Sequence, residues 1–276
     1  MPKKIVSIDY KVISTEIIGK IHGQQSNSKP IGYIIVSDGE ISGISEVYLS
    51  TYFSVYANSI FNFFNDKFAG EICDDILRRI NNFSIPFVSR NGIFTSCLGC
   101  FENALLDLAA KQKGLPLYEF LNSENLDHAF KYYASGGSVI MSSEEIIDEI
   151  GIISAQNFDG YKIRIGLKSW DEDMERVDAA SRYNGYVMVD GICGTRNPPY
   201  NLQEALSVSE YLIEKEIYWF EEPLHPDNYA EMKILQENSS INIAAGEAYS
   251  GIGEFQNFIN FAKTNYVQFD ACHSGG

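Results

Sequence analysis

Short apolar runs alternate with helical stretches along the second half of the chain. The runs lie at residues 132–136, 161–165, 186–190, 218–222, 243–247 and 266–270. Continuous apolar runs of this length are typical of parallel strands that are buried on both faces. From Arg164 to Asp190, Glu221, Glu247 and Asp270 the successive intervals are 26, 31, 26 and 23 residues, each the length of one strand–helix unit. The pattern predicts about six such units, arranged as a (β/α)8-type barrel or as an open doubly wound sheet.

The first 130 or so residues follow a different pattern, with strands first and helices second. Residues rich in Val, Ile and Tyr predict strands at 5–14, 32–36 and 43–48, and helical patterns follow at 55–65, 71–81 and 95–113. The polar stretch 23–30, within the longer polar segment 19–30, predicts a hairpin loop between the first two strands. We therefore expect an α+β N-terminal domain at residues 1–130, followed by the strand–helix domain at 131–276.

The polar residues at the predicted strand ends distinguish the barrel from the open sheet. An open sheet usually carries a glycine-rich phosphate turn, and no predicted strand leads into Gly-x-Gly-x-x-Gly here. Instead, successive strands end in a carboxylate, at Asp190, Glu221, Glu247 and Asp270. In a barrel, the carboxyl ends of successive strands surround one site. We therefore favour an incomplete (β/α)8-type barrel, with about six strand–helix units present.

Composition narrows the classes of partner. The chain of 276 residues has 37 acidic and 21 basic side chains, and its formal net charge is −16. Nucleic acid and anionic membrane surfaces attract basic patches, so neither is expected as a partner. No window of about 18 apolar residues predicts a membrane span. The five cysteines are an odd number in a long chain, which indicates a reducing, cytoplasmic location without a disulfide framework.

The strand-end carboxylates and two cations can form one site. Asp190, Glu221 and Glu247 offer oxygen ligands, which suit Mg²⁺ or Mn²⁺ better than Zn²⁺. Alternation along the strand at 161–165 places Lys162 and Arg164 on the same face of the sheet. Inside a barrel, these two cations need anionic partners nearby. The structural alternatives are a solvated cap for each carboxylate and an internal ion pair for the cations.

The motifs also resemble a known family in their order along the chain. The resemblance is to the enolase superfamily, in its mandelate racemase/muconate-lactonising enzyme group. Residues 103–118 resemble the last helix of that family's capping domain. The motifs of the barrel are Lys162-Ile163-Arg164, Val189-Asp190, Phe220-Glu221-Glu222-Pro223, Gly246-Glu247 and Phe269-Asp270 followed by Gly275-Gly276.

The resemblance implies a role for each matching residue. The ligands of Mg²⁺, with Mn²⁺ as an alternative ion, would be Asp190, Glu221 and Glu247. Lys162 matches the lysine that contacts the substrate carboxylate and the developing enolate. Arg164 stands where many members carry the base, as a second lysine or a histidine. Because a guanidinium stays protonated at any working pH, Arg164 is a poor base.

Three further residues match other parts of the family's site. Asp270 corresponds to the aspartate that partners a catalytic histidine at the end of the next strand. His22 and Gln24 lie in the polar segment that resembles a loop closing over substrate. His273 lies three residues past Asp270, in the wrong element to be that histidine. The family's last barrel strands have no counterpart here, so the sequence is expected to be a fragment of a longer enzyme.

The chemistry that the resemblance implies is Mg²⁺-dependent abstraction of the proton α to a carboxylate, with a metal-stabilised enolate intermediate. A histidine–Asp270 dyad as base points to a lyase that dehydrates a hydroxy or sugar acid. The alternatives are a racemase, epimerase or cycloisomerase of the same superfamily, or a catalytically inactive metal-binding fragment. A retaining glycosidase is a competing class, but it has no need of Asp190 or of two inward cations. The expected partner is a small carboxylate substrate, and homo-oligomers are a family-level expectation.

Overall fold

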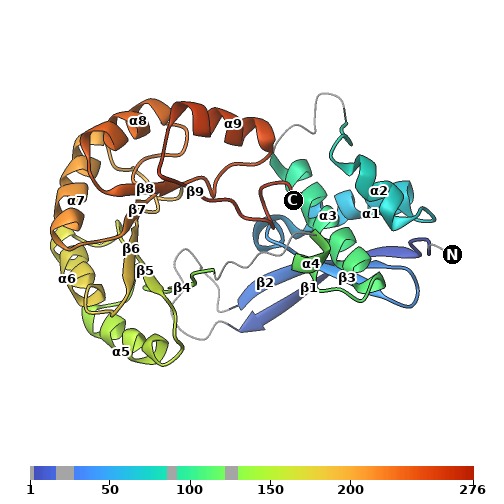
Figure 1. Ribbon diagram of the computed structural model, residues 1–276, viewed down its shortest axis with the longest axis horizontal. Helices are drawn as coiled ribbons and strands as arrows, with labels where there is room; N and C mark the ends of the chain where they lie inside the picture. Colours follow the sequence, from blue (N-terminus) through green and yellow to red (C-terminus); the bar gives the residue numbers. More distant parts are fainter. Residues whose placement is uncertain (1–2, 17–27, 86–91, 122–129) are drawn as a thin grey trace.

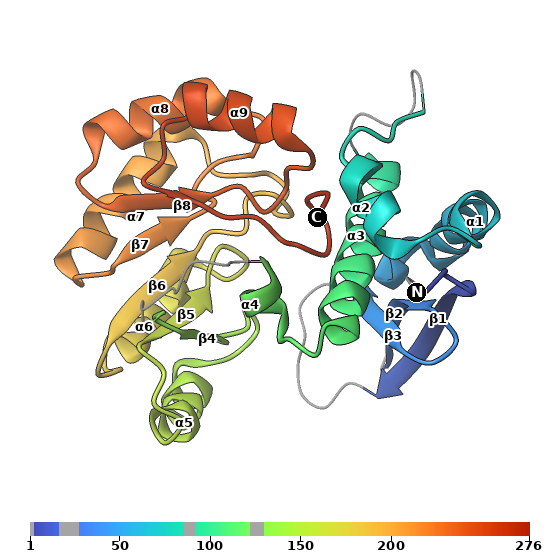
Figure 2. The ribbon, with the colours of Figure 1, turned by 45° about the vertical axis from the view of Figure 1, so that its right-hand side comes forward.

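The computed structural model describes residues 3–16, 28–85, 92–121 and 130–276. Its N-terminal part is an antiparallel sheet in which the central strand pairs with both neighbours. Helices pack against this sheet (Figures 1 and 2). The strands are β1 (Ser7–Glu16), β2 (Ser28–Ser37) and β3 (Ser42–Val47). The helices are α1 (Ser50–Phe68), α2 (Cys73–Ile80), α3 (Gly92–Gln112) and α4 (Leu117–Leu121).

Helix α3 forms the centre of this N-terminal part. By length and composition it is the one helix of the described residues that could cross a membrane. Its buried residues, Cys97 and Cys100 among them, pack in one cluster with the sheet and α1. Gly43 lies so close to α3 that a side chain there would meet the carbonyl oxygen of Ala104 at 2.0 Å. These contacts are those of the core helix of a folded domain.

The C-terminal part is a curled sheet of six parallel strands with helices on its outer face (Figure 1). Neighbouring strands are consecutive in the sequence, and a helix connects each pair. The predicted barrel-type fold is confirmed. The strands are β4 (Tyr133–Ser135), β5 (Gly160–Arg164), β6 (Tyr186–Asp190), β7 (Trp219–Glu221), β8 (Asn242–Ala245) and β9 (Tyr266–Val267). The helices are α5 (Ser143–Ser154), α6 (Trp170–Ala180), α7 (Leu202–Glu214), α8 (Tyr229–Asn238) and α9 (Ile252–Phe261).

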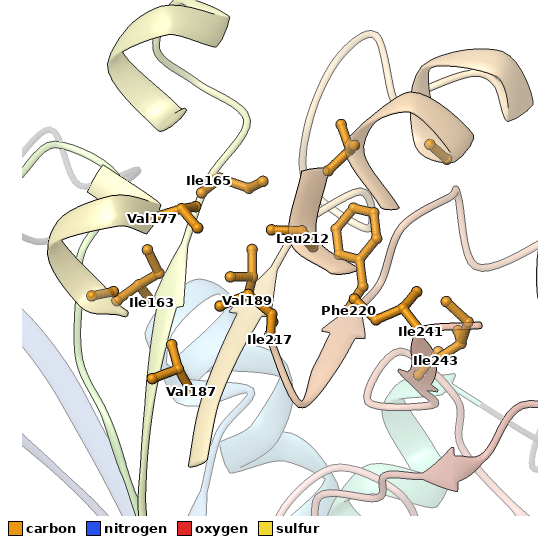
Figure 3. Packing of buried hydrophobic residues seen from close by; sticks show 14 of the residues in the cluster. Ile163, Ile165, Val177, Val187, Val189, Leu212, Ile217, Phe220, Ile241 and Ile243 are labelled. Atoms are coloured by element: carbon orange, nitrogen blue, oxygen red, sulfur yellow. The ribbon is translucent and has the colours of Figure 1, made fainter. Parts of the chain in front are cut away.

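Alternation along the strands separates an apolar outer layer from a polar interior. Ile163, Val189, Phe220 and Ile243 belong to the hydrophobic cluster that joins the strands to the helices, as Figure 3 shows. The residues directly before and after each of these in the strand therefore point to the inside of the curl. Strands β5, β6 and β7 end in register, with Arg164 opposite Asp190 and Asp190 opposite Glu221, so their polar residues reach the same edge of the sheet.

The N-terminal caps of three helices fix the loops at that edge of the sheet. Helices α5, α6 and α7 each begin with a capping box, in which a side chain and a glutamate three residues later satisfy each other's backbone N–H groups. The caps are Ser142, Ser169 and Asn201. The loops that lead from the site edge into these helices are therefore closed by local hydrogen bonds.

Two of the predicted barrel strands end more than one residue earlier in the structure than predicted. β8 ends at Ala245 and β9 at Val267, so Glu247 and Asp270 follow their strands instead of ending them. The cause at β8 is Gly246, whose φ of 132° only glycine adopts readily, and where a side chain would meet the carbonyl oxygen of Gln268 at 2.4 Å. The chain turns at this close contact, which carries Glu247 past the sheet.

Candidate active site

Lys162 and two carboxylates form a buried ion cluster at the edge of the sheet. Asp190 and Glu221 are the last residues of β6 and β7, and Lys162 lies in the neighbouring strand β5. Nζ of Lys162 lies 2.5 Å from Oε1 of Glu221 and 3.8 Å from Oδ2 of Asp190. The exposed fractions of the three side chains are only 6% for Lys162, 4% for Asp190 and 0% for Glu221. Because a buried charge is stable only when it is paired, the three groups stabilise one another as a unit.

Arg164 makes contacts of a different kind. Its Nη1 donates to the carbonyl oxygen of Gly136 at 2.9 Å, and its Nη2 donates to Oγ of Ser135 at 3.1 Å. Its Nε lies 3.6 Å from Oδ2 of Asp190. The guanidinium thus connects the end of β4 to the Asp190 carboxylate. These are the contacts of a positioning residue, in agreement with the poor basicity of arginine.

Burial and mutual repulsion perturb the carboxylates of the site. Burial, and then the charge of Glu221, raises the pKa of Asp190 to about 7. Burial, and then the charges of Glu247 and Asp190, raises the pKa of Glu222 to about 8. Burial lowers the pKa of Lys162, but Glu221 and Asp190 outweigh this effect and keep that pKa above its ordinary value. The site therefore holds more negative charge than Lys162 neutralises, and a further cation would be stabilised there.

A cavity of about 490 Å³ lies over this ion cluster. Lys162, Glu221, Glu247 and Asp270 all line it, together with Tyr133 and residues 267–271. Desolvation, and then the charge of Glu221, raises the pKa of Glu247, although this side chain still reaches solvent. The structure thus brings four of the predicted site residues to one cavity.

The Asp270 carboxylate is already engaged in a local turn. Its Oδ1 accepts a hydrogen bond from the backbone N–H of Cys272 at 2.8 Å. His273 belongs to the same turn but faces away from the cavity, toward the N-terminal part. Its Nδ1 lies 3.2 Å from Oγ of Ser96, and its ring packs edge-on against Tyr48. His273 therefore lies at the interface between the N-terminal and C-terminal parts of the fold.

The donor set suits a hard divalent cation in its chemistry. Asp190, Glu221 and Glu247 offer carboxylate oxygens alone, and the raised pKa values of Asp190 and Glu247 favour a cation beside them. Within the part of the chain that the structure describes, no three Asp, Glu, His or Cys side chains are gathered closely enough to hold a metal ion. The ammonium of Lys162 lies between Asp190 and Glu221 in this arrangement. The metal-ligand assignment stays a prediction.

The structure adds residues that the sequence analysis did not single out. Nε1 of Trp219 donates to Oε2 of Glu221 at 3.2 Å, so both oxygens of this carboxylate are bound. Trp219 precedes Glu221 by two positions, and strand alternation was the signal that both share a face. The ring of Tyr133 lies 5.7 Å from Nζ of Lys162, in cation–π range. Glu222 is also buried and accepts the backbone N–H of Gly194 at 3.1 Å.

Two predicted residues cannot be placed. His22 and Gln24, the predicted substrate contacts, lie outside the described residues. Ile192, two positions past Asp190, supports the Asp190 carboxylate through its backbone. Its N–H donates to Oδ1 of Asp190 at 2.8 Å. Ile192 adopts a positive φ of 45° in doing so.

Comparison with known proteins finds a family match in the C-terminal part of the chain. Residues 145–276 match the family described as "Enolase C-terminal domain-like". The arabinonate dehydratase of Saccharolobus solfataricus is 29% identical over 192 residues, which are 68% of this chain and 50% of that protein. The L-talarate/galactarate dehydratase of Salmonella typhimurium is 26% identical over 192 residues, 68% of this chain and 47% of that protein. The chain spans about half the length of the curated relatives it matches.

Solved structures share the whole fold. A crystal structure of an enolase from Bradyrhizobium, complexed with magnesium and mandelic acid, superposes with a TM-score of 0.83 at 18% identity. The superposition covers 100% of this chain and 76% of that protein. The match over residues 145–276 and the dehydratase relatives support the resemblance to the enolase superfamily, in its mandelate racemase/muconate-lactonising enzyme group. The resemblance found in the sequence motifs is confirmed.

Proposed function

We propose that this protein is part of a Mg²⁺-dependent lyase that acts on a hydroxy or sugar acid. The enzyme would remove the proton α to the substrate carboxylate and then expel the β-hydroxyl. The observation that carries the proposal is the buried cluster of Lys162 with Asp190 and Glu221, which lies beneath a cavity large enough for a small acid. Such a cluster has little value for stability alone, because burying charges is costly even when they are paired. The names of the relatives support dehydration as the reaction.

Each group of the cluster would have a distinct task. Asp190, Glu221 and Glu247 would hold the cation, with Mg²⁺ as the first choice and Mn²⁺ as an alternative. The bound cation would supply positive charge that lowers the cost of forming an enolate from a carboxylate. Lys162 stays protonated and would bind the substrate carboxylate directly, since its ammonium lines the cavity. Arg164 would hold Asp190 in place from the other side.

The proton-transfer group would be a histidine oriented by Asp270. A base needs a pKa near the working pH, which histidine has and arginine lacks. Asp270 lines the cavity, and no histidine is among the cavity-lining residues in the described part of the chain. The same dyad in its protonated form would donate a proton to the departing β-hydroxyl, which completes the elimination.

The proposal extends to the partner, the location and the assembly of the enzyme. A small hydroxylated carboxylate is the proposed partner, and the proposed location is the cytoplasm. All five cysteines are unpaired, which supports a reducing compartment. Assembly into a homo-oligomer is part of the proposal, on the family resemblance alone.

The test is solvent deuterium exchange. The full chain would be incubated with Mg²⁺ and arabinonate in D₂O, and proton NMR would follow the α-proton and the appearance of a 2-keto-3-deoxy acid. Exchange with loss of the β-hydroxyl supports the lyase. Exchange without that loss replaces it by a racemase or epimerase. Mg²⁺ binding with neither reaction leaves the inactive metal-binding alternative and overturns catalysis by this chain. Glu221→Gln removes one carboxylate of the site. Its matched control is Glu237→Gln, on the exposed face of α8.

A further inference from the structure

A second cavity lies away from the candidate active site, on the side of the outer helices. Its volume is about 320 Å³, and no residue lines both cavities. Residues of α6 and α7, and of the loops that precede them, form its walls. Figure 1 shows these two helices as neighbours in the outer layer. The site proposed below therefore does not rest on the proposed function of the first cavity.

Arg196 gives this cavity an uncommitted positive charge. Its Nε donates to the carbonyl oxygen of Gly166 at 2.6 Å, and its guanidinium stacks 3.9 Å from the centre of the Tyr200 ring. Nη1 is buried and has no hydrogen-bond partner among the described residues, and no described carboxylate pairs with Arg196. Because a buried donor without a partner is costly, a ligand oxygen that reached this guanidinium would be strongly favoured.

The acidic residues around the cavity already have partners. Asp173 is bound by Nη1 of Arg176 and by the backbone N–H of Gly166, both at 2.8 Å. Glu204 accepts the backbone N–H of Asn201 at 2.8 Å in the cap of α7. The other lining cation, Lys168, pairs with Glu172 at 3.6 Å. Arg196 is thus the lining cation without a carboxylate partner among the described residues, and its guanidinium can receive an anionic group. The nearness of two carboxylates disfavours a dianion such as phosphate, so a monocarboxylate fits better.

The other walls suit hydroxyl groups and the apolar face of a sugar chain. Trp170 lines the cavity with 38% of its surface exposed. Gln203 and Ser207 line it from α7, and both side chains are exposed. An aromatic face beside polar side chains is the usual lining of a site that orients a small polar ligand. We propose that this cavity binds a small hydroxylated monocarboxylate, with its carboxylate on Arg196 and its hydroxyls toward Gln203 and Ser207.

Tryptophan fluorescence tests this site separately from the active site. The chain has two tryptophans, so a Trp219→Phe background leaves Trp170 as the sole tryptophan reporter. D-gluconate is the probe, and the expected result is a saturable change in fluorescence. Arg196→Gln is expected to raise Kd about tenfold or more, because a charge-assisted hydrogen bond is lost. Arg182→Gln, an exposed arginine just past the other end of α6, should leave Kd unchanged.

A second variant guards against a folding defect in Arg196→Gln. Ser207→Tyr fills the cavity from an exposed position on α7 and keeps Arg196 in the chain, and it should also abolish the fluorescence change. Far-ultraviolet circular dichroism checks that both variants are folded. The proposal is overturned if gluconate gives no saturable change or if inorganic phosphate binds and gluconate does not. It is also overturned if Glu221→Gln abolishes the change, which would assign the binding to the first cavity.

Discussion

Replacing Lys162 by methionine removes the only cation within 4 Å of Glu221 among the described residues. The exposed fractions of the two side chains are 6% and 0%, so the carboxylates lose their partner in a water-poor environment. Breaking a buried ion pair in this way costs about 3–5 kcal/mol. We therefore expect Lys162→Met to lower the free energy of unfolding by about that amount at pH 8, where the carboxylates are most ionised.

The sign of the pH effect follows from the same geometry. Without the ammonium, Asp190 relieves its repulsion with Glu221 by taking up a proton. The pKa of Asp190 in the folded state, already raised, then lies further above that in the unfolded chain, so the loss of stability shrinks as pH falls. Urea unfolding followed by circular dichroism at pH 5 and pH 8 measures the difference. Mg²⁺ should restore more stability to the variant than to the wild type, because it replaces the missing positive charge.

A matched control is Lys233→Met. Lys233 pairs with Glu237 on α8 at 3.7 Å, but the exposed fractions of these side chains are 43% and 58%. A change within about 0.5 kcal/mol is expected there, at either pH. The reasoning is refuted if Lys162→Met is no more destabilising than this control, or if its effect is the same at pH 5 and pH 8.

Three further predictions concern stability. The pKa of Asp190 is raised to about 7, above its unfolded value of 3.8, so the folded chain binds more protons than the unfolded chain between these pH values. The free energy of unfolding should therefore fall as pH rises from 5 to 8. Asp190→Asn should flatten this slope in urea titrations. Gly99→Ala in α3 should destabilise the chain by about 1–3 kcal/mol, because its Cβ would meet Gly276 N at 2.2 Å. Gly151→Ala in α5, where nothing lies within 4 Å, should leave the melting temperature unchanged or raise it.

Much of the fold could be predicted from local sequence because hydrophobic runs report burial directly. The strand at 186–190 was predicted with its observed limits, and the other barrel strands were predicted in the correct order. The strand ends at Gly246 and after Val267 could not be predicted. They depend on close contact between neighbouring chain segments, which a single run of residues does not reveal.

The candidate site could be predicted as far as the order of the strands determines which residues lie close together. The residues Lys162, Glu221, Glu247 and Asp270 line one cavity because the strands are consecutive in the sheet. The burial of Glu222 was not foreseen, since alternation points it away from the interior next to Glu221. Its backbone has a positive φ of 40°, and its carboxylate binds the N–H of Gly194 on the preceding loop. That contact joins residues far apart in sequence, which local patterns do not show.

The central claim is that Asp190, Glu221 and Glu247 bind a divalent cation. The most direct test is isothermal titration calorimetry of the full chain with Mg²⁺ at pH 8, comparing wild type, Glu221→Gln and Glu237→Gln. We expect saturable binding to the wild type and to Glu237→Gln, and a loss of at least about tenfold in affinity for Glu221→Gln, since one charged ligand is removed. Absence of binding to the wild type, or equal affinity in all three proteins, would contradict it.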